Sequence, residues 1–312
     1  MKKVLAIVGP TAVGKTSLSI ELAKRLNGEI ISGDSMQVYR TLDIGTAKVT
    51  KKEMSGIPHH LIDIKEVTEG YSVSEFQATA REVIATICSR GKLPIVVGGT
   101  GLYIQSLLWD YKLGNERDQQ DPRLRRMYEA YAKEHGKEAL WRYLAERDPL
   151  AAQKIHLNNQ KKVIRALEVF ELTGRSIMVP EKEPKLLYDA YLIGLDTKRE
   201  LLYARIDQRV ESMLESGILD EARSLYKTPT VQAAQGIGYK EFFPYFAGEI
   251  SLEEAAAVVQ QQSRRYAKRQ LTWFRNRMDV HWYDLVQHPE DISQIISAAK
   301  CWLEEGSVCQ NE

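Results

Sequence analysis

Gly9-Pro10-Thr11-Ala12-Val13-Gly14-Lys15-Thr16 decides the fold of this 312-residue chain. The stretch fits the pattern G-x-x-x-x-G-K-[S/T], follows an apolar run at residues 3–8 and precedes a helical pattern over residues 15–26. A strand, a glycine-rich turn and a helix in this order are typical of a P-loop, whose backbone N–H groups surround phosphate oxygens. Lys15 adds a charge, and Thr16 offers a hydroxyl to Mg²⁺. These eight residues predict a diphosphate site and leave open which group the phosphates carry.

Strands and helices are predicted to alternate on both sides of this loop. Apolar runs predict further buried strands at residues 29–32, 94–97 and 188–195, and an edge strand at residues 280–285. Capping boxes predict helices that begin after Ser72, Thr197 and Ser251, each followed by a glutamate three residues later. We therefore predict an α/β fold with the parallel sheet of the P-loop NTPases.

The middle of the chain has helical patterns and almost no strand signal. Asp121-Pro122 and Asp148-Pro149 each place a capping aspartate before a proline suited to the first helical position. We therefore expect an inserted all-helical domain at residues 115–187. It would interrupt a P-loop α/β catalytic core made of residues 1–114 and 188–312.

Composition and charge narrow the classes of function. Hydrophobic residues make up 44% of the chain and charged residues 27%, while the formal net charge is only +1, so a nucleic-acid site must come from local clusters. Cys88, Cys301 and Cys309 have no zinc-ligand spacing, and their odd number disfavours a disulfide framework. No apolar run is long enough for a signal peptide or a membrane span, so we expect a cytoplasmic protein. Nothing in the sequence demands an oligomer, and a monomer is expected.

Two polar residues, Asp34 and Thr100, follow predicted strands. Ligands of an open parallel sheet bind beyond the carboxyl ends of its strands, so both side chains are expected near the phosphate loop. Asp34 then suits a metal ligand or a general base, and Thr100 a contact to phosphate or to the reacting atom. Helix capping remains the alternative for each. For His59-His60 a structural role is favoured over a metal pair, because adjacent side chains point apart.

A basic cluster lies near the end of the chain. Residues 263–277 contain six basic residues and no acidic one: Arg264, Arg265, Lys268, Arg269, Arg275 and Arg277. Such a run is often a solvated helix face, but without internal neutralisation a phosphate backbone is a natural counter-charge. A second candidate for contact with nucleic acid is Gln235-Gly236-Ile237-Gly238-Tyr239-Lys240, a glycine-spaced loop with one aromatic and one basic side chain.

Taken in order, these motifs resemble the bacterial tRNA dimethylallyltransferases, also called tRNA isopentenyltransferases. The resemblance extends over almost the whole chain and rests mainly on the Asp34, Thr100 and Lys268 motifs. The matching stretches are residues 9–16, Asp34-Ser-Met-Gln-Val-Tyr39, Ile57-Pro-His-His-Leu-Ile-Asp63, Gly98-Gly-Thr-Gly-Leu-Tyr103, Arg165-Ala-Leu-Glu-Val169, Gly236-Ile-Gly-Tyr-Lys240 and Lys268-Arg-Gln-Leu-Thr-Trp-Phe274.

The resemblance implies transfer of a dimethylallyl group from dimethylallyl diphosphate to N6 of the adenosine 3′ to the anticodon of tRNA. Asp34 would be the general base, Thr100 would position the reacting centre, and Mg²⁺ with Thr16 would take up charge on the diphosphate. The insertion would hold the anticodon stem-loop. The implied tRNA contacts are Asp34, Ser35, Met36, Gln37, Thr100, Arg123, Asn158, Asn159, Gln160, Lys161, Lys162, Gln235, Gly236, Ile237, Gly238, Tyr239, Lys240, Arg264, Lys268 and Arg269.

Two departures from the family pattern limit this inference. Family members often read His-Pro-Asn-Asp and then arginine where this chain has His156-Leu-Asn-Asn159 and Lys162, and lysine cannot make a bidentate arginine contact. The zinc finger of eukaryotic relatives is absent, which suggests the bacterial type. Two rival functions remain: an ATP-dependent small-molecule or nucleoside kinase, and a non-catalytic RNA-binding NTPase module. Neither rival accounts for the phosphate loop, Asp34, Thr100 and the basic residues together.

Overall fold

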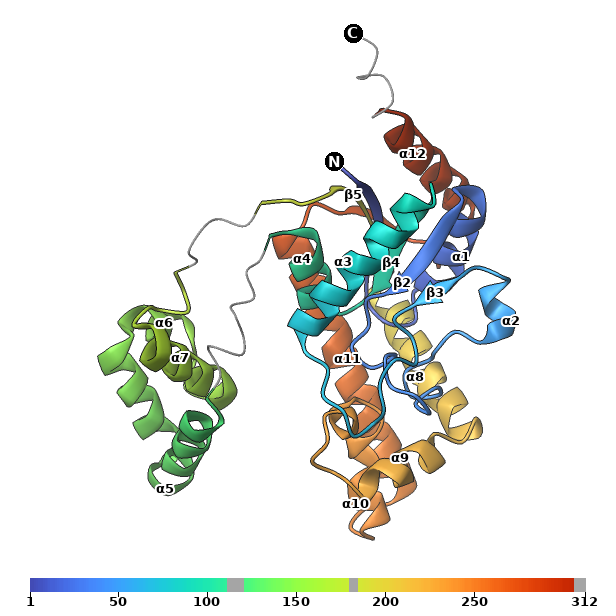
Figure 1. Ribbon diagram of the computed structural model, residues 1–312. Helices are drawn as coiled ribbons and strands as arrows, with labels where there is room; N and C mark the ends of the chain where they lie inside the picture. Colours follow the sequence, from blue (N-terminus) through green and yellow to red (C-terminus); the bar gives the residue numbers. More distant parts are fainter. Residues whose placement is uncertain (111–120, 180–184, 306–312) are drawn as a thin grey trace. The chain divides into compact units, whose positions relative to one another are not determined.

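The computed structural model describes residues 1–110, 121–179 and 185–305, which fall into two compact units (Figure 1). Unit 1 comprises Met1–Trp109 and Leu186–Glu312, and unit 2 comprises Asp110–Lys185. Each unit has its own hydrophobic core. The predicted α/β class with a helical insertion is confirmed.

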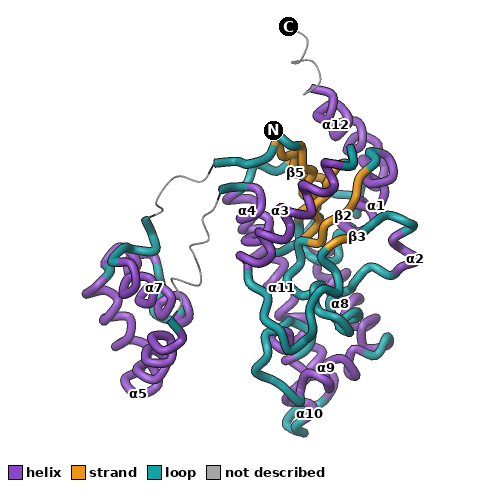
Figure 2. Tube along the Cα trace, viewed as in Figure 1, coloured by secondary structure: helices purple, strands orange, loops and turns teal. Residues whose placement is uncertain are grey.

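Unit 1 is built on one six-stranded sheet in which all paired strands are parallel. The strands lie in the order β3 (His59–His60), β2 (Gly28–Ser32), β4 (Leu93–Gly98), β1 (Lys3–Val8), β5 (Asp189–Leu195) and β6 (His281–Tyr283). Figure 2 shows these strands in orange, with loops in teal extending beyond them. The β3 strand was not predicted, because two histidines carry no apolar pattern, yet its backbone pairs with β2 at one edge.

Side chains of β1 alternate between two buried layers, as the period of a strand requires. Val4, Ala6 and Val8 join the layer formed with α3 (Val73–Ser89), α4 (Gly101–Leu108) and α11 (Leu252–Arg277). Leu5 and Ile7 join the opposite layer, with α1 (Lys15–Arg25), α12 (Ile292–Glu305) and the first half of α8 (Arg199–Glu215). Because both faces are covered, a ligand can reach the sheet of unit 1 most readily at the ends of the strands.

Two of the three predicted capping boxes are confirmed. Ser72 caps α3 with Glu75, and Ser251 caps α11 with Glu254. The prediction at Thr197 is wrong: α8 has Lys198 as its N-cap without a side-chain bond, and the Thr197 hydroxyl instead donates to Asp284 Oδ2 at 3.0 Å. The remaining helices of unit 1 are short: α2 (Lys51–Met54), α9 (Ile218–Tyr226) and α10 (Phe243–Phe246).

In the described part of unit 2, residues 121–179, the regular elements are the helices α5 (Pro122–Arg147), α6 (Pro149–Lys154) and α7 (Gln160–Thr173), joined by turns. Asp121 and Asp148 cap α5 and α6 through their side chains, as predicted. Gly136 has a φ of 85° and interrupts α5, so the helix runs in two segments. Leu140, Leu144 and Leu167 lie in the small core that joins the three helices.

The chain leaves and re-enters unit 1 at paired residues. Trp109 and Leu186 form an antiparallel bridge, and the amide of Leu187 donates to the Leu108 carbonyl at 2.8 Å. No helix within the described residues is long and apolar enough to cross a membrane. Cys88 and Cys301 are free thiols. Residues 306–312, which include Cys309, lie outside the described residues.

Candidate active site

A cavity of about 590 Å³ lies in unit 1, beyond the carboxyl ends of β1, β2 and β4. Its walls come from four loops and from the facing sides of α8 and α11. The lining comprises residues 11–16 of the phosphate loop, residues 34–37 and 45–47 after β2, Gly98 and Gly99 after β4, residues 235–240, and Arg209, Tyr266, Arg269 and Gln270. The structure therefore brings together motifs that are spread over more than 250 residues of sequence.

The phosphate loop has the backbone geometry of an anion site. Gly9 and Gly14 have φ values of 137° and 91°, and Gly14 is the N-cap of α1. A Cβ at Gly9 would lie 2.3 Å from the Leu195 carbonyl oxygen, so β5 admits only glycine there. Ala12 also has a left-handed φ of 66°, although it carries a Cβ. The loop thus directs its amide groups and the start of α1 toward the cavity, a geometry suited to phosphate oxygens.

Lys15 is held close to this loop by a bond from its ammonium group to the Pro10 carbonyl. Burial and the neighbouring Arg209 lower the pKa of Lys15 to about 8, while Asp34 acts in the opposite direction. Burial also lowers the pKa of Arg209, which the Asp34 carboxylate supports in its charged form. Two cations facing one cavity create a strong site for a polyanion such as a diphosphate.

Arg209 was not among the predicted site residues. It lies on α8 and lines the cavity with Lys15 and Asp34, from which it is far in sequence. Its helix pattern is that of an ordinary surface, and one arginine on such a helix carries no spacing signal. Tyr266 on α11 was missed for the same reason. Burial and the Asp34 carboxylate raise the pKa of Tyr266 to about 12.

Asp34 occupies the first turn after β2 and lines the cavity. Its Oδ1 accepts from the amide of Met36 at 2.8 Å, which closes a local turn and fixes the carboxylate. No helix begins in this loop, so the helix-capping alternative for Asp34 is wrong. The carboxylate faces the same space as the phosphate loop and can accept a proton there.

Thr100 stands at the N-cap position of α4, but its side chain makes no capping bond. The hydroxyl oxygen instead accepts from the amide of Ser35 at 3.4 Å, which ties the β4 end to the Asp34 loop. The helix-capping alternative is therefore wrong for this side chain as well. Thr100 is not among the lining residues, whereas its neighbours Gly98 and Gly99 are.

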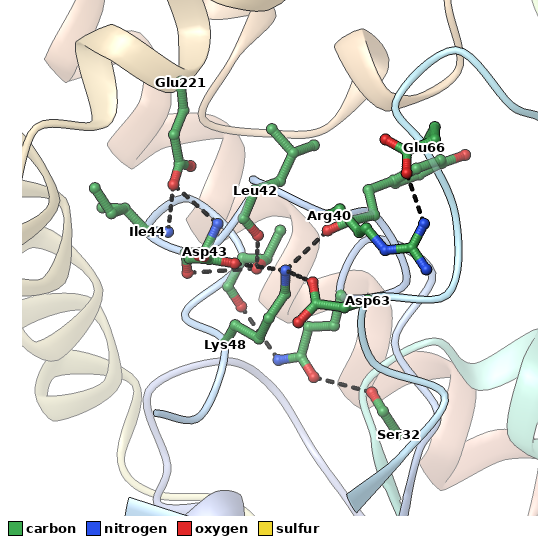
Figure 3. A network of polar contacts seen from close by, with 12 residues as sticks. Ser32, Arg40, Leu42, Asp43, Ile44, Lys48, Asp63, Glu66 and Glu221 are labelled. Carbon is green, nitrogen blue, oxygen red and sulfur yellow. Dashed lines mark hydrogen bonds and ion pairs between the residues drawn. The ribbon is translucent and has the colours of Figure 1, made fainter. Parts of the chain in front are cut away.

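The loop that follows Asp34 is held by a polar network (Figure 3). The Lys48 ammonium donates to Asp43 and to Asp63, each at 2.6 Å, and to the Tyr39 carbonyl at 2.8 Å. The Gln37 amide accepts from Ser32 Oγ at 2.9 Å and donates to the Thr46 carbonyl at 3.3 Å. Because both ends of the loop are bonded back to the strand region, Met36 and Gln37 are fixed against the cavity.

The glycine-spaced loop 235–240 forms a further wall of the cavity. The Tyr239 hydroxyl donates to Glu221 Oε2 at 2.9 Å, and its ring is almost fully buried, with 1% exposure. The Tyr239 ring is thus packed in the core and cannot stack on a base. Lys240 donates to the Gln235 carbonyl at 3.0 Å and lines the cavity.

The basic run on α11 is partly neutralised by carboxylates of α8 and of the loop after β5, contrary to the expectation from sequence. Arg264 forms two bonds to Asp207 of α8, at 2.6 and 2.7 Å, and Arg275 pairs with Asp196 at 2.6 Å. Arg265 and Lys268 are exposed and have no carboxylate partner within the described residues. Arg269 is exposed beside the Tyr266 ring at 5.5 Å and lines the cavity. Fewer residues of α11 therefore carry an unpaired positive charge than the basic run in the sequence suggests.

Unit 2 carries the other predicted contacts. Arg123, Asn158, Asn159, Gln160, Lys161 and Lys162 are all exposed at the starts of α5 and α7. Lys137 bonds to the Asn158 side chain, so the turn before α7 gathers polar and basic groups. Arg125 and Arg165 instead bond to the buried Glu168, at 2.9 and 3.0 Å.

The paired histidines have structural partners. His60 bonds to the buried Glu29 at 2.8 Å, and His59 Nδ1 bonds to the Ile57 carbonyl at 2.8 Å. Burial lowers the pKa of His59, which lines the cavity. The described residues contain no group of three or more His, Cys, Asp or Glu side chains that could hold a metal ion. The expected structural role of the histidines is consistent with these bonds.

Comparison with known proteins gives one consistent family. A family model described as IPP transferase matches residues 37–277. The tRNA dimethylallyltransferase of Enterococcus faecalis is 62% identical over 305 residues, covering 98% of this chain and 99% of that protein. The corresponding protein of Bacillus mycoides is 54% identical over 299 residues, covering 95% of this chain and 93% of that protein.

Solved structures agree with these relatives. The full-length tRNA isopentenylpyrophosphate transferase of Bacillus halodurans is similar with a TM-score of 0.76 and 48% identity, covering 100% of both chains. A eukaryotic dimethylallyltransferase described as acting on tRNA is similar with a TM-score of 0.80 and 33% identity, covering 94% of this chain and 77% of that chain.

Proposed function

Because the chain belongs to the IPP transferase family, we propose that it transfers a dimethylallyl group from dimethylallyl diphosphate to N6 of the adenosine 3′ to the anticodon in tRNA. The general activity, dimethylallyl transfer to tRNA, follows from 62% identity over nearly the full chain to a tRNA dimethylallyltransferase. The proposal concerns the donor, the acceptor atom and the roles of individual residues. We further propose that the enzyme acts as a cytoplasmic monomer.

The observation that carries the proposal is the joint lining of one cavity by the phosphate loop and Asp34. The diphosphate of the donor would lie on the loop amides, with Lys15 and Arg209 against its oxygens. As the bond from C1 to the bridging oxygen breaks, negative charge grows on the diphosphate. Cations fixed in advance stabilise that charge without reorganising, which lowers the barrier. The Thr100 hydroxyl, next to Ser35, would orient the bridging oxygen.

Asp34 would hold the N6 amine of the acceptor base and remove its proton. The bond from Asp34 to the Met36 amide leaves one carboxylate oxygen for this task. A base stacked in an RNA helix cannot reach a cavity lined by loops and helices, so the nucleotide would be flipped into it. In this scheme N6 forms a bond to C1, the diphosphate leaves with the bonding electrons, and the proton passes to Asp34.

Mg²⁺ is the cofactor we propose. Thr16 lines the cavity at the first turn of α1 and offers one hydroxyl oxygen. The described residues provide no all-protein metal cage, which suits Mg²⁺ because it usually keeps water and substrate phosphate oxygens as ligands. When bound, the ion would neutralise part of the charge on the diphosphate. Thr16 would hold it, and the loop amides would hold the remaining oxygens.

Surfaces of both units would bind the tRNA. In unit 1 we propose residues 34–37, Thr100, residues 235–240, Lys268 and Arg269. In unit 2 we propose Arg123 and residues 158–162 for the anticodon stem-loop. We assign Arg264 to support of α11, since its charge is already paired with Asp207.

One experiment separates this function from that of a small-molecule or nucleoside kinase. The protein is mixed with tRNA, Mg²⁺ and radiolabelled dimethylallyl diphosphate, and a parallel reaction contains ATP with candidate small acceptors. Label on the tRNA that depends on the adenosine supports the transferase. Consumption of ATP without label on the tRNA would contradict the transferase function and indicate a kinase. The Asp34→Asn protein is the matched negative control, because asparagine keeps the turn and loses the base.

A further inference from the structure

Glu221 on α9 joins two walls of the cavity through a single carboxylate. Its Oε1 accepts from the amides of Asp43 and Ile44, each at 2.8 Å. Its Oε2 accepts from the amide of Gly45 at 3.1 Å and from the Tyr239 hydroxyl at 2.9 Å. Figure 3 shows Glu221 reaching down from its helix to this loop. Four donors from two separate loops therefore converge on one side chain.

The two loops are in close contact at the same place. A Cβ at Gly45 would lie 2.5 Å from the Tyr239 ring, and a Cβ at Gly236 would lie 2.6 Å from Met36 Cε. Glycines at both positions let the loop after Asp34 pack directly on the loop 235–240. Gly45, Met36 and Gly236 all line the cavity. A shift of either loop would therefore change the shape of the cavity between them.

Removal of the Glu221 carboxylate would leave its hydrogen-bond donors without their acceptor and so destabilise the protein. Tyr239 is almost fully buried, and a buried hydroxyl without a partner is destabilising. The neighbouring Asp43 and Asp63 carboxylates both pair with Lys48 at 2.6 Å, so Lys48 does not provide a partner for Glu221. Glu221 is not among the residues that line the cavity, although both loops that it bonds are.

We propose that Glu221 is a positioning residue that fixes the loop after Asp34 and the loop 235–240 relative to each other, so that the acceptor nucleotide enters between two walls of set separation. This inference rests on the proposed function, in which both loops contact tRNA. The phosphate loop is not bonded to Glu221. Removal of the carboxylate therefore affects the acceptor side and spares the binding of a diphosphate.

The first test needs no activity. Hydrogen exchange followed by mass spectrometry compares the wild type with Glu221→Gln over peptides that cover residues 42–48 and 235–242. Glutamine has one acceptor oxygen in place of two, so we expect faster exchange in both segments and unchanged exchange in α1. Glu215→Gln is the matched control, an exposed glutamate at the end of α8 without a hydrogen bond within the described residues. Unchanged exchange at residues 42–48 would overturn the proposal.

The second test separates positioning from general loss of structure. For Glu221→Gln we expect kcat/KM for tRNA to fall about tenfold, the scale of a lost charge-assisted bond, and Tyr239→Phe to cause a smaller fall. Binding of inorganic diphosphate, measured by calorimetry, should change less than about twofold because that site is separate. The double variant should be no worse than Glu221→Gln alone, since both changes act through one carboxylate.

The outcomes distinguish failure of the positioning role of Glu221 from failure of the proposed function. The positioning role would be overturned if the losses in kcat/KM for tRNA were additive in the double variant. It would also be overturned if Glu221→Gln weakened diphosphate binding as much as it lowered kcat/KM for tRNA. A wild-type protein that fails to prenylate tRNA would instead overturn the proposed function. In that case the exchange experiment still decides whether Glu221 holds the two loops together.

Discussion

Arg205 on α8 donates from Nε to the carbonyl oxygen of Ala12, 2.7 Å away, and Ala12 has a left-handed φ of 66°. A residue with a Cβ in this region is strained by roughly 1–2 kcal/mol, so the phosphate loop needs support there. We expect Arg205→Ala to raise the KM for the donor about fivefold and to leave the KM for tRNA unchanged. Initial rates with each substrate varied in turn measure the two constants.

Ala12→Gly provides the control for this prediction, because glycine adopts a positive φ without strain. In the Arg205→Ala background, Ala12→Gly should recover part of the lost donor affinity. If the double variant binds the donor as weakly as Arg205→Ala, then Arg205 acts by touching the diphosphate and not through the loop.

The low pKa of Lys15 predicts a pH dependence of donor binding. With a pKa of about 8, Lys15 is mostly charged at pH 7 and mostly neutral at pH 9. Phosphate groups complete their ionisation near pH 6, so the charge of the donor is constant in this window. We therefore expect the KM for the donor to rise between pH 7 and pH 9. Lys15→Arg keeps its charge throughout and should abolish the rise, even if its affinity is lower. A flat profile in the wild type would contradict the prediction.

Asp34→Asn tests the general base without disturbing the loop. Asparagine keeps the oxygen that accepts from the Met36 amide, so tRNA affinity should stay within about twofold. Loss of the base should lower kcat about 10²-fold, the usual contribution of such a group. Single-turnover rates at saturating donor measure this step. Asp34→Ala loses the turn as well and should bind tRNA less tightly. Normal turnover in Asp34→Asn would remove Asp34 from the mechanism.

The basic side chains of α11 that lack a carboxylate partner among the described residues predict how salt affects tRNA binding. Lys268→Gln should make the slope of log K against log salt concentration less steep by about 1, as expected for one lost phosphate contact. Arg264→Gln is the matched comparison: its charge is already paired with Asp207, so it should change the slope little and lower Tm instead. Equal changes of slope in the two variants would show that Arg264 also reaches the RNA.

Gly99 and Gln270 form a tight contact at the edge of the cavity. Gln270 Nε2 donates to the Gly99 carbonyl at 3.0 Å, and a Cβ at Gly99 would lie 1.9 Å from that nitrogen. Gly99→Ala should therefore destabilise the protein by about 1–3 kcal/mol, measured by thermal or denaturant unfolding. Adding Gln270→Ala removes the clash and should recover most of this loss. If the double variant does not recover stability, the strain lies in the backbone at residue 99 and not in the contact with Gln270.

The sheet was predictable where burial determines sequence. The uninterrupted apolar run of β1 identifies a strand covered on both faces, and the run before Gly98 identifies β4. The strand β3 could not be found, because only two residues pair with β2 and both are histidines. Thr197 shows a further limit: its sequence suits a cap, but a tertiary bond to Asp284 takes its hydroxyl.

The site was predictable to the extent that its residues form contiguous motifs. The phosphate loop and the Asp34 loop carry their chemistry within a few residues, so their positions in the cavity followed from strand order. Arg209 and Glu221 each contribute one side chain from an amphipathic helix, and no local pattern distinguishes them from surface charges. The pairing of Arg264 was invisible because Asp207 lies 57 residues earlier. Charge counted along a sequence therefore overstates the charge left free in the fold.

The bridge between Trp109 and Leu186 has a consequence for how such a chain can evolve and be engineered. Exit and return of the polypeptide are adjacent, and the next pair, Asp110 and Lys185, is still bonded at 2.7 Å. The segment between these residues is therefore a cassette whose two ends join unit 1 at one place. Recombination could replace this cassette with another small domain, or a short turn could close the gap, without changing the path of the chain through the sheet. The α/β unit with its cavity and the helical unit are thus separable units of inheritance within one gene.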